Sequence, residues 1–158
     1  MKLEKIKSFE GLKKHKRLRE EWNYSMALLL AIERKKDLSS VSEQYINIEV
    51  SSFNQKKHTI KSAIRDLGNL QSNILRQLRQ HEGYRLPDYY QNHYMAVGTV
   101  FIGIPIGLSI AYFSSNWSLL LIGFPFGMIV GALFGRQKDK LVKSNNQQLD
   151  VQVELDLM

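Results

Sequence analysis

The chain has 158 residues, enough for about one domain, and a formal net charge of +7 at pH 7. It contains no cysteine, which excludes disulfides and cysteine-ligated metal sites. No Asp, Glu, Lys or Arg occurs between Asp88 and Arg136, so the charges divide the sequence into parts. We expect a basic cytoplasmic helical domain over residues 1–88, a transmembrane hairpin over residues 89–136 and a cytoplasmic tail over residues 137–158.

The N-terminal part is predicted to be helical, with one helix over about residues 8–36 and a second over about residues 41–81. The second carries apolar residues at alternating steps of four and three from residue 46 to residue 78, which is a heptad pattern with Lys57 and Gln71 as polar interruptions. This pattern predicts either a helical hairpin whose apolar seams bury each other or a coiled coil between molecules. Residues 1–94 hold 18 Lys and Arg against 11 Asp and Glu. Such a basic domain is expected to lie against anionic lipid, and because no nucleic-acid-binding motif is visible, nucleic acid is not an expected partner.

Two runs of 19 uncharged, mostly apolar residues follow, over residues 95–113 and 117–135. As helices each would be roughly 28 Å long, close to the ~30 Å hydrocarbon core of a bilayer. Only Ser114, Ser115 and Asn116 separate them, so the two helices are predicted to form an antiparallel transmembrane hairpin. The alternative is a helical hairpin buried in a soluble core.

Positive charges flank the hairpin on one side only. Arg136, Lys138, Lys140 and Lys143 follow the second helix, whereas the turn between the helices carries no charge. By the positive-inside rule, both termini are expected in the cytoplasm, with these four residues at the surface of the inner (cytoplasmic) membrane.

The block Ile-Gly-x-Pro-x-Gly occurs once in each predicted membrane helix. If residue 95 lies level with residue 135 in the hairpin, Pro105 lies level with Pro125 near the midplane of the bilayer. Neither proline can donate the backbone hydrogen bond of a regular helix. We therefore expect a kink shared by both helices at this depth, or a constriction if the protein gates a pore.

Small residues recur every four residues on both predicted membrane helices and form two stripes. Stripes of this kind let helix backbones approach closely, which drives helix association in lipid. The stripes either pack against each other within one hairpin, or one of them faces neighbouring subunits and builds a ring. Their members are Thr99, Gly103, Gly107, Ala111, Gly123, Gly127, Gly131 and Gly135. The pattern resembles the glycine zipper of small two-helix membrane proteins of bacteria.

The C-terminal tail alternates apolar and polar residues over residues 149–157, which predicts a short β-strand. Its partner would be residues 45–50, which also alternate, or another subunit. The alternatives are a disordered tail and a helix over residues 45–50. The fold class is thus an all-α membrane protein, a cytoplasmic helical hairpin or coiled coil plus a two-helix transmembrane hairpin, with a short β-strand at the C-terminus.

Catalytic motifs are sparse. No phosphate-cradling loop is present, and the four histidines lack metal-ligand spacing, so we expect no enzyme activity, no metal site and no cofactor. Arg76 and His81 form an Arg-x4-His pair that resembles the motif of HEPN ribonucleases. The layout of a helical cytoplasmic part and a two-helix membrane hairpin also resembles small two-transmembrane effectors of bacterial defence systems.

These features favour a small membrane protein that self-associates through the glycine-stripe helices, as a homo-oligomer in the lipid bilayer. It would act as a membrane-perturbing effector or pore, or as a scaffold. One alternative is an accessory subunit of a larger membrane complex, bound to other membrane subunits. A membrane-anchored HEPN-like ribonuclease is the more distant alternative.

Overall fold

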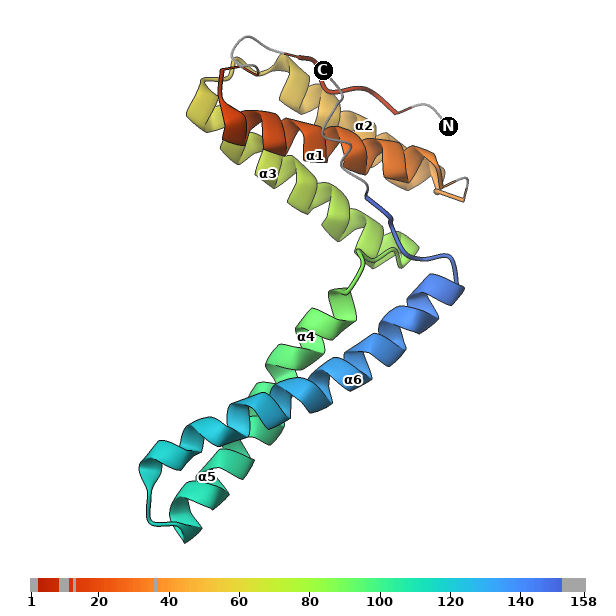
Figure 1. Cartoon of the computed structure of the whole chain (residues 1–158). Coiled ribbons are helices and arrows are strands. Elements are labelled where there is room, and N and C mark those ends of the chain that lie inside the picture. The colour runs from red at the N-terminus through yellow and green to blue at the C-terminus, as the bar shows by residue number, and fades with distance from the viewer. Residues whose placement is uncertain (1–2, 9–11, 13, 36, 152–158) are drawn as a thin grey trace. The chain divides into compact units, whose positions relative to one another are not determined.

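The computed structural model describes residues 3–8, 12, 14–35 and 37–151, and the regular elements among them are all helical (Figure 1). The chain divides into two compact units. Unit 1 comprises residues 1–85 and 149–158, and unit 2 comprises residues 86–148.

Unit 1 contains three helices, α1 (Lys16–Glu33), α2 (Ser40–Gln55) and α3 (Ile60–Gln77). A π-helical turn, η1 (Leu78–Glu82), extends α3 and ends at Gly83, whose positive φ of 73° suits a residue without a Cβ. Helix α3 packs against both α1 and α2 (Figure 1). Apolar residues from all three helices form the core, with fully buried side chains at Leu18, Leu28, Ile32, Ile46, Val50, Leu67 and Ile74.

The prediction of one helix over residues 41–81 is wrong, because the chain breaks between α2 and α3. Lys56 is extended, with ψ of 144°, and α3 then starts behind Thr59 as its N-cap. Thr59 and Ser62 form a capping box, in which the side-chain oxygen of each residue accepts a hydrogen bond from the backbone N–H of the other. The apolar spacing continues in phase across this break, which is why the heptad pattern suggested a single helix.

One further boundary in unit 1 needs correction, because the first helix begins at Lys16 rather than near residue 8. For residues 45–50 a helix and a strand were both open, and the structure has them inside α2 as helix. Of the strand predicted over residues 149–157, residues 152–157 lie outside the described part. Leu149 is buried, and its backbone N–H donates to the carbonyl of Arg85 (2.8 Å).

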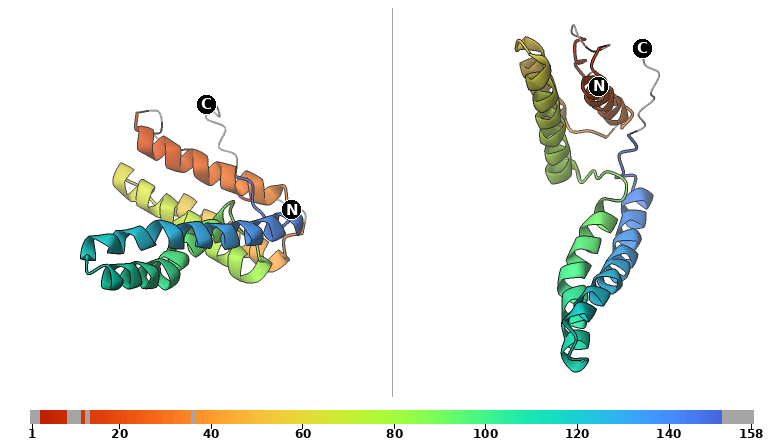
Figure 2. Two further views of the ribbon diagram at one scale, coloured as in Figure 1. Left: turned by 60° about the horizontal axis from the view of Figure 1, so that its bottom comes forward. Right: turned by 60° about the vertical axis from the view of Figure 1, so that its left-hand side comes forward.

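Unit 2 is a helical hairpin. Its first arm runs without interruption through α4 (Tyr89–Gly98), the π-helical turn η2 (Thr99–Gly103) and α5 (Ile104–Phe113). The second arm begins with a 3-10 helix, η3 (Trp117–Ile122), and continues as α6 (Gly123–Ser144). The two arms lie side by side and antiparallel, as Figure 2 shows from two directions. The predicted antiparallel hairpin is confirmed.

Three residues make the turn of the hairpin, as predicted. Ser115 takes a left-handed conformation, with φ of 50°. The N–H of Asn116 donates to the carbonyl of Ala111 (3.1 Å), and its side-chain oxygen accepts the N–H of Ser118 (3.0 Å). Asn116 thereby closes the first arm and caps the second.

Candidate functional site

The arms of the hairpin meet along a seam of glycines. The buried residues of its helices are Gly98, Gly103, Gly107, Ala111, Gly123, Gly127, Gly131 and Gly135. A Cβ built on Gly123 would lie 2.5 Å from the amide nitrogen of Gly107, and one on Gly127 would lie 2.7 Å from that of Gly103. Real Cβ atoms do not approach other atoms so closely, so any side chain at these positions would separate the two backbones.

The seam extends to the open end of the hairpin. A Cβ on Gly131 would lie 3.0 Å from the Cα of Met95, and one on Gly135 would lie 2.6 Å from the carbonyl oxygen of Tyr90. The two glycine stripes therefore pack against each other inside one chain. A second molecule cannot occupy the same seam while the hairpin is closed.

One prediction for the stripe is wrong, because Gly98 lies in the seam where Thr99 was expected. Gly98 is buried, and a Cβ on it would lie 3.0 Å from the Cα of Gly131, whereas Thr99 is only half-buried. The reason is the π-helical turn η2, where the N–H of Ile104 donates to the carbonyl of Thr99, five residues earlier. One residue is thereby added to the turn, and the stripe steps back from Gly103 by five residues rather than four.

Both prolines lie in the first turn of an α-helical segment. Pro105 is the second residue of α5, directly after η2, and Pro125 is the third residue of α6, directly after η3. Each proline thus directly follows a change in the hydrogen-bonding pattern of its arm, from π to α before Pro105 and from 3-10 to α before Pro125. Both residues are exposed, so they face away from the glycine seam. The kink expected at the two prolines stays a prediction.

The outer surface of the hairpin is apolar. Phe101, Phe113 and Trp117 have exposed fractions of 75%, 84% and 71%, and many Val, Ile and Leu side chains around them are exposed as well. The helical segments Tyr89–Phe113 and Trp117–Ser144 are long and apolar enough to cross a membrane, and each contains an 18-residue apolar stretch, with mean hydropathies of 1.9 and 2.0. Only 22% of either apolar stretch is buried. Helices in a soluble core would be mostly buried, so the structure does not support that alternative.

At the open end, an acidic side chain ties the two arms together. The carboxylate of Asp139 on α6 accepts the backbone N–H groups of Tyr90 (3.0 Å) and Gln91 (2.8 Å), the first two residues after Tyr89 in α4. A carboxylate is favoured there because the N-terminus of a helix carries partial positive charge and unpaired N–H groups. Asp88, the N-cap residue itself, forms no side-chain cap. Sequence reasoning missed Asp139, because its partners lie almost 50 residues away.

The four basic residues predicted at the membrane surface lie on α6 at this open end. Arg136 Nε donates to the side-chain oxygen of Gln91 (3.0 Å). Lys138 Nζ lies 5.6 Å and 5.2 Å from the ring centroids of Tyr90 and Tyr94, within the range of cation–π attraction. Lys140 and Lys143 line a cavity together with Arg136.

In unit 1, the carboxylate of Glu82 is the centre of a hydrogen-bond network. It accepts hydrogen bonds from the Ser42 hydroxyl (2.6 Å), the Ser39 backbone N–H (3.3 Å) and the Ser39 hydroxyl. Burial on its own would raise the pKa of Glu82, but the hydrogen bonds from Ser39 and Ser42, with the nearby charge of His81, together lower it. Ser39 is also the N-cap of α2. The network thus joins the end of η1 to the start of α2.

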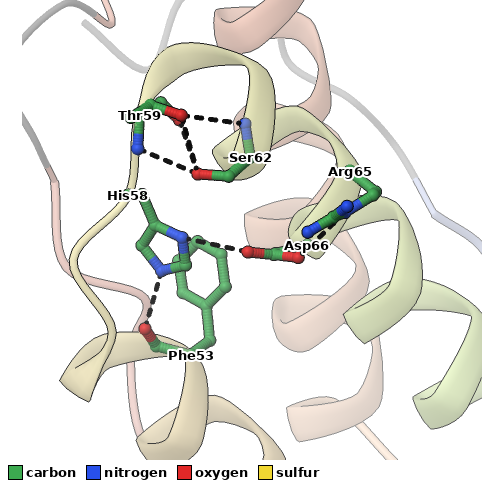
Figure 3. A network of polar contacts seen from close by, with 6 residues as sticks. All are labelled: Phe53, His58, Thr59, Ser62, Arg65 and Asp66. Carbon is green, nitrogen blue, oxygen red and sulfur yellow. Dashed lines mark hydrogen bonds and ion pairs between the residues drawn. The ribbon is translucent and has the colours of Figure 1, made fainter.

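A second polar cluster surrounds His58 at the turn between α2 and α3 (Figure 3). Its ring stacks on Phe53 with centroids 4.2 Å apart, and Nε2 donates to the Phe53 carbonyl (2.9 Å). Nδ1 lies 3.2 Å from a carboxylate oxygen of Asp66. The hydroxyls of Thr59 and Ser62 bond to each other (3.1 Å) within the capping box. These contacts hold the turn, and the cluster is structural.

The remaining candidates are the Arg-x4-His pair and a metal site. Arg76 lies in the last turn of α3 and His81 in η1, and both side chains are exposed. In the part of the chain that the structure describes, no group of three His, Cys, Asp or Glu residues could hold a metal ion. No family model, curated protein or solved structure matches the chain.

Proposed function

We propose that the chain is an integral protein of the cytoplasmic membrane whose helical hairpin crosses the bilayer twice, with both termini in the cytoplasm. One observation carries this proposal: in the hairpin, glycines and Ala111 are buried while the large apolar side chains face outward. In water such a surface is unfavourable by roughly 25 cal/mol for each Å² exposed. In lipid it is the favoured surface, and close backbone packing holds the helices together.

The aromatic and basic residues support this orientation. Tyr94 and Tyr112 are separated by about 27 Å of helix, close to the thickness of the hydrocarbon core. Further aromatic residues lie next to each of them, as expected at the two membrane interfaces. The positive charges of Arg136, Lys138 and Lys140 follow the apolar stretch on the side of the chain termini.

Within the membrane, we propose a non-enzymatic scaffold that self-associates and holds the three-helix unit at the cytoplasmic surface. Since the glycine seam is filled inside the hairpin, copies would meet through the outer faces, where Phe126 and Phe134 of α6 are exposed. A pore is less well supported. The hydroxyls of Thr99 and Ser109 donate to carbonyls of their own helices (2.8 and 2.9 Å), which satisfies them without water.

An accessory subunit of a larger membrane complex is the second candidate. It is favoured by the exposed fractions of Val41 (65%) and Ile48 (67%) on α2. These two residues are seven apart and therefore lie on one face of the helix. An exposed apolar face of this kind suits a protein partner of the cytoplasmic unit.

Topology is tested by reporter fusions at residues 90, 115 and 145, together with extraction of membranes at alkaline pH. The proposal expects an external reporter signal at residue 115 alone and a protein that stays in the membrane. A cytoplasmic signal at residue 115, or release into the alkaline supernatant, would refute it.

Self-association is tested by the native mass of the protein in nanodiscs. We expect an oligomer that the double substitution Phe126→Ala/Phe134→Ala weakens, because it removes outward-facing contact area. A wild-type protein that is monomeric at every concentration would contradict self-association and favour the accessory subunit.

A further inference from the structure

The open end of the hairpin contains a basic cavity of about 490 Å³. Arg136, Lys140 and Lys143 line it from α6, and Gln91 lines it from α4. The three cations are spaced by four and three residues, so they lie along one face of α6. All of these residues belong to unit 2, and the cavity is formed by the hairpin alone.

Hydrogen bonds between the two arms hold the walls of this cavity. Arg136 Nε donates to Gln91, which orients the guanidinium group. Asp139 also lines the cavity, and its two carboxylate oxygens accept the N–H groups of Tyr90 and Gln91. That acidic charge is therefore directed at the N-terminus of α4. Arg136, Lys140 and Lys143 form no ion pair with any described residue and outnumber the acidic residues of the lining, Asp88 and Asp139.

The position of the cavity identifies the class of ligand. It begins where the charge-free stretch ends, at Asp88 in one arm and Arg136 in the other. In a membrane-spanning hairpin this is the level of lipid headgroups. The exposed apolar side chains just below it, such as Leu133 and Val97, would lie beside the acyl chains of a lipid whose phosphate entered the cavity.

We propose that this cavity binds the phosphate of an anionic phospholipid, with Arg136, Lys140 and Lys143 as its ligands. Arg136 supplies planar paired donors, and the two lysines supply mobile point charges. The inference rests on the proposed membrane insertion and adds a defined lipid site to it. Lys138, which lies over the rings of Tyr90 and Tyr94, is not part of the lining and serves as a control on the same helix.

The test compares two variants with the same change in net charge, Lys140→Gln/Lys143→Gln and Lys16→Gln/Lys138→Gln. The full chain is inserted into nanodiscs that contain phosphatidylcholine with a minor fraction of phosphatidylglycerol, and retained lipid is counted by native mass spectrometry. Wild type should retain phosphatidylglycerol over phosphatidylcholine. In the cavity variant, the ratio of retained phosphatidylglycerol to phosphatidylcholine should fall about tenfold or more, and in the control variant it should stay close to that of wild type.

Each other outcome has a defined meaning. An inserted wild type without preference for phosphatidylglycerol, or two variants that lose it equally, would overturn the lipid site and leave membrane insertion standing. A wild type that fails to insert would overturn both. Millimolar inorganic phosphate that displaces the lipid would show that the cavity takes free phosphate instead.

Discussion

Gly103 and Gly127 contact each other through their backbones. A Cβ on Gly127 would lie 2.7 Å from the amide nitrogen and 2.8 Å from the Cα of Gly103. The two backbones are therefore in direct contact at this depth, with no room for a side chain at Gly127 between them. Dispersion between two backbones at such short range is the main attraction available to helices in lipid.

Gly127→Leu should open or unfold the hairpin, because the new side chain must push the two arms apart. We expect a loss of about 3 kcal/mol or more, at the upper end of the cost of overpacking. Thermal unfolding of the full chain in detergent micelles measures this loss. Gly131→Leu should behave in the same way.

The matched control for that experiment is Leu133→Ala. Leu133 is large and exposed on the outer face of the same helix. Its truncation should cost less than about 1 kcal/mol, because it leaves no cavity in a packed interior. A hairpin that loses as much stability from Leu133→Ala as from Gly127→Leu would show that the glycine seam does not hold it.

The hairpin and most of its seam could be predicted from the sequence, because hydropathy and four-residue spacing report directly on helix faces. The exception is Gly98. Four-residue spacing back from Gly103 leads to Thr99, which is also small, so nothing in the pattern indicated a π-helical turn. Gly98 itself pointed to a close helix contact, since it is the only glycine in the sequence from residue 89 to residue 102.

Pro125→Ala should change the stability of the hairpin by less than about 0.5 kcal/mol. Pro125 lies in the first turn of α6, where the absent N–H does not interrupt the helix, and its side chain faces outward. The comparison is Leu133→Pro in the interior of α6, which should cost about 3 kcal/mol or more. A large effect of Pro125→Ala would instead show that the proline contributes to the stability of the hairpin.

Glu82→Gln should destabilise unit 1 near neutral pH and leave it unchanged in acid. The folded state lowers the pKa of Glu82, so its contribution is complete above the usual value of 4.5 and is lost as the pH falls through the lowered pKa. Because Glu82 is partly exposed, we expect only about 1 kcal/mol at pH 7. Chemical denaturation of wild type and variant between pH 7 and pH 3 gives the difference at each pH.

Glu20→Gln is the control for this pH dependence. Glu20 is exposed on α1 and pairs only weakly with Lys16, at 3.8 Å. Its substitution should leave both the stability and its pH profile close to those of wild type. If Glu82→Gln destabilises the chain equally at pH 7 and pH 3, the effect comes from the shape of the side chain and not from its charge.

Gly68→Ala should stabilise unit 1 by about 0.5–1 kcal/mol. Gly68 lies inside α3, and a Cβ added there meets nothing within 4 Å. Alanine reduces the conformational freedom of the unfolded chain and suits a helix interior. Denaturation midpoints of the two proteins measure the gain. A loss of stability would mean that the space beside Gly68 is filled by a partner.

The helix break at residues 56–59 has a signal in the sequence, the capping pair Thr59 and Ser62, but the apolar repeat favoured a single helix. Other contacts could not be predicted, because they join distant segments. Gln71 donates to the carbonyl of Glu21 (3.2 Å) and to the hydroxyl of Ser25 (2.9 Å), so a residue that interrupts the apolar pattern is a cross-link between helices. Spacing shows which residues share a face, and it does not show which polar groups will meet across it.

The extra residue in η2 also shifts the register of the residues that face α6 in the first arm. On the turn side of η2, these residues are spaced by four from Gly103 through Gly107 to Ala111. On the open side, they are spaced by four back from Gly98 to Tyr94. Deleting one residue between 99 and 103 would place Gly98 four residues before Gly103, where a regular α-helix keeps both glycines on the seam. Inserting one residue there would instead rotate α4 by about 100° relative to α5 and turn the Gly98 face away from α6. The hairpin thus depends on chain length in this segment, and an insertion there should be more harmful than a deletion or than a single substitution on the outer face.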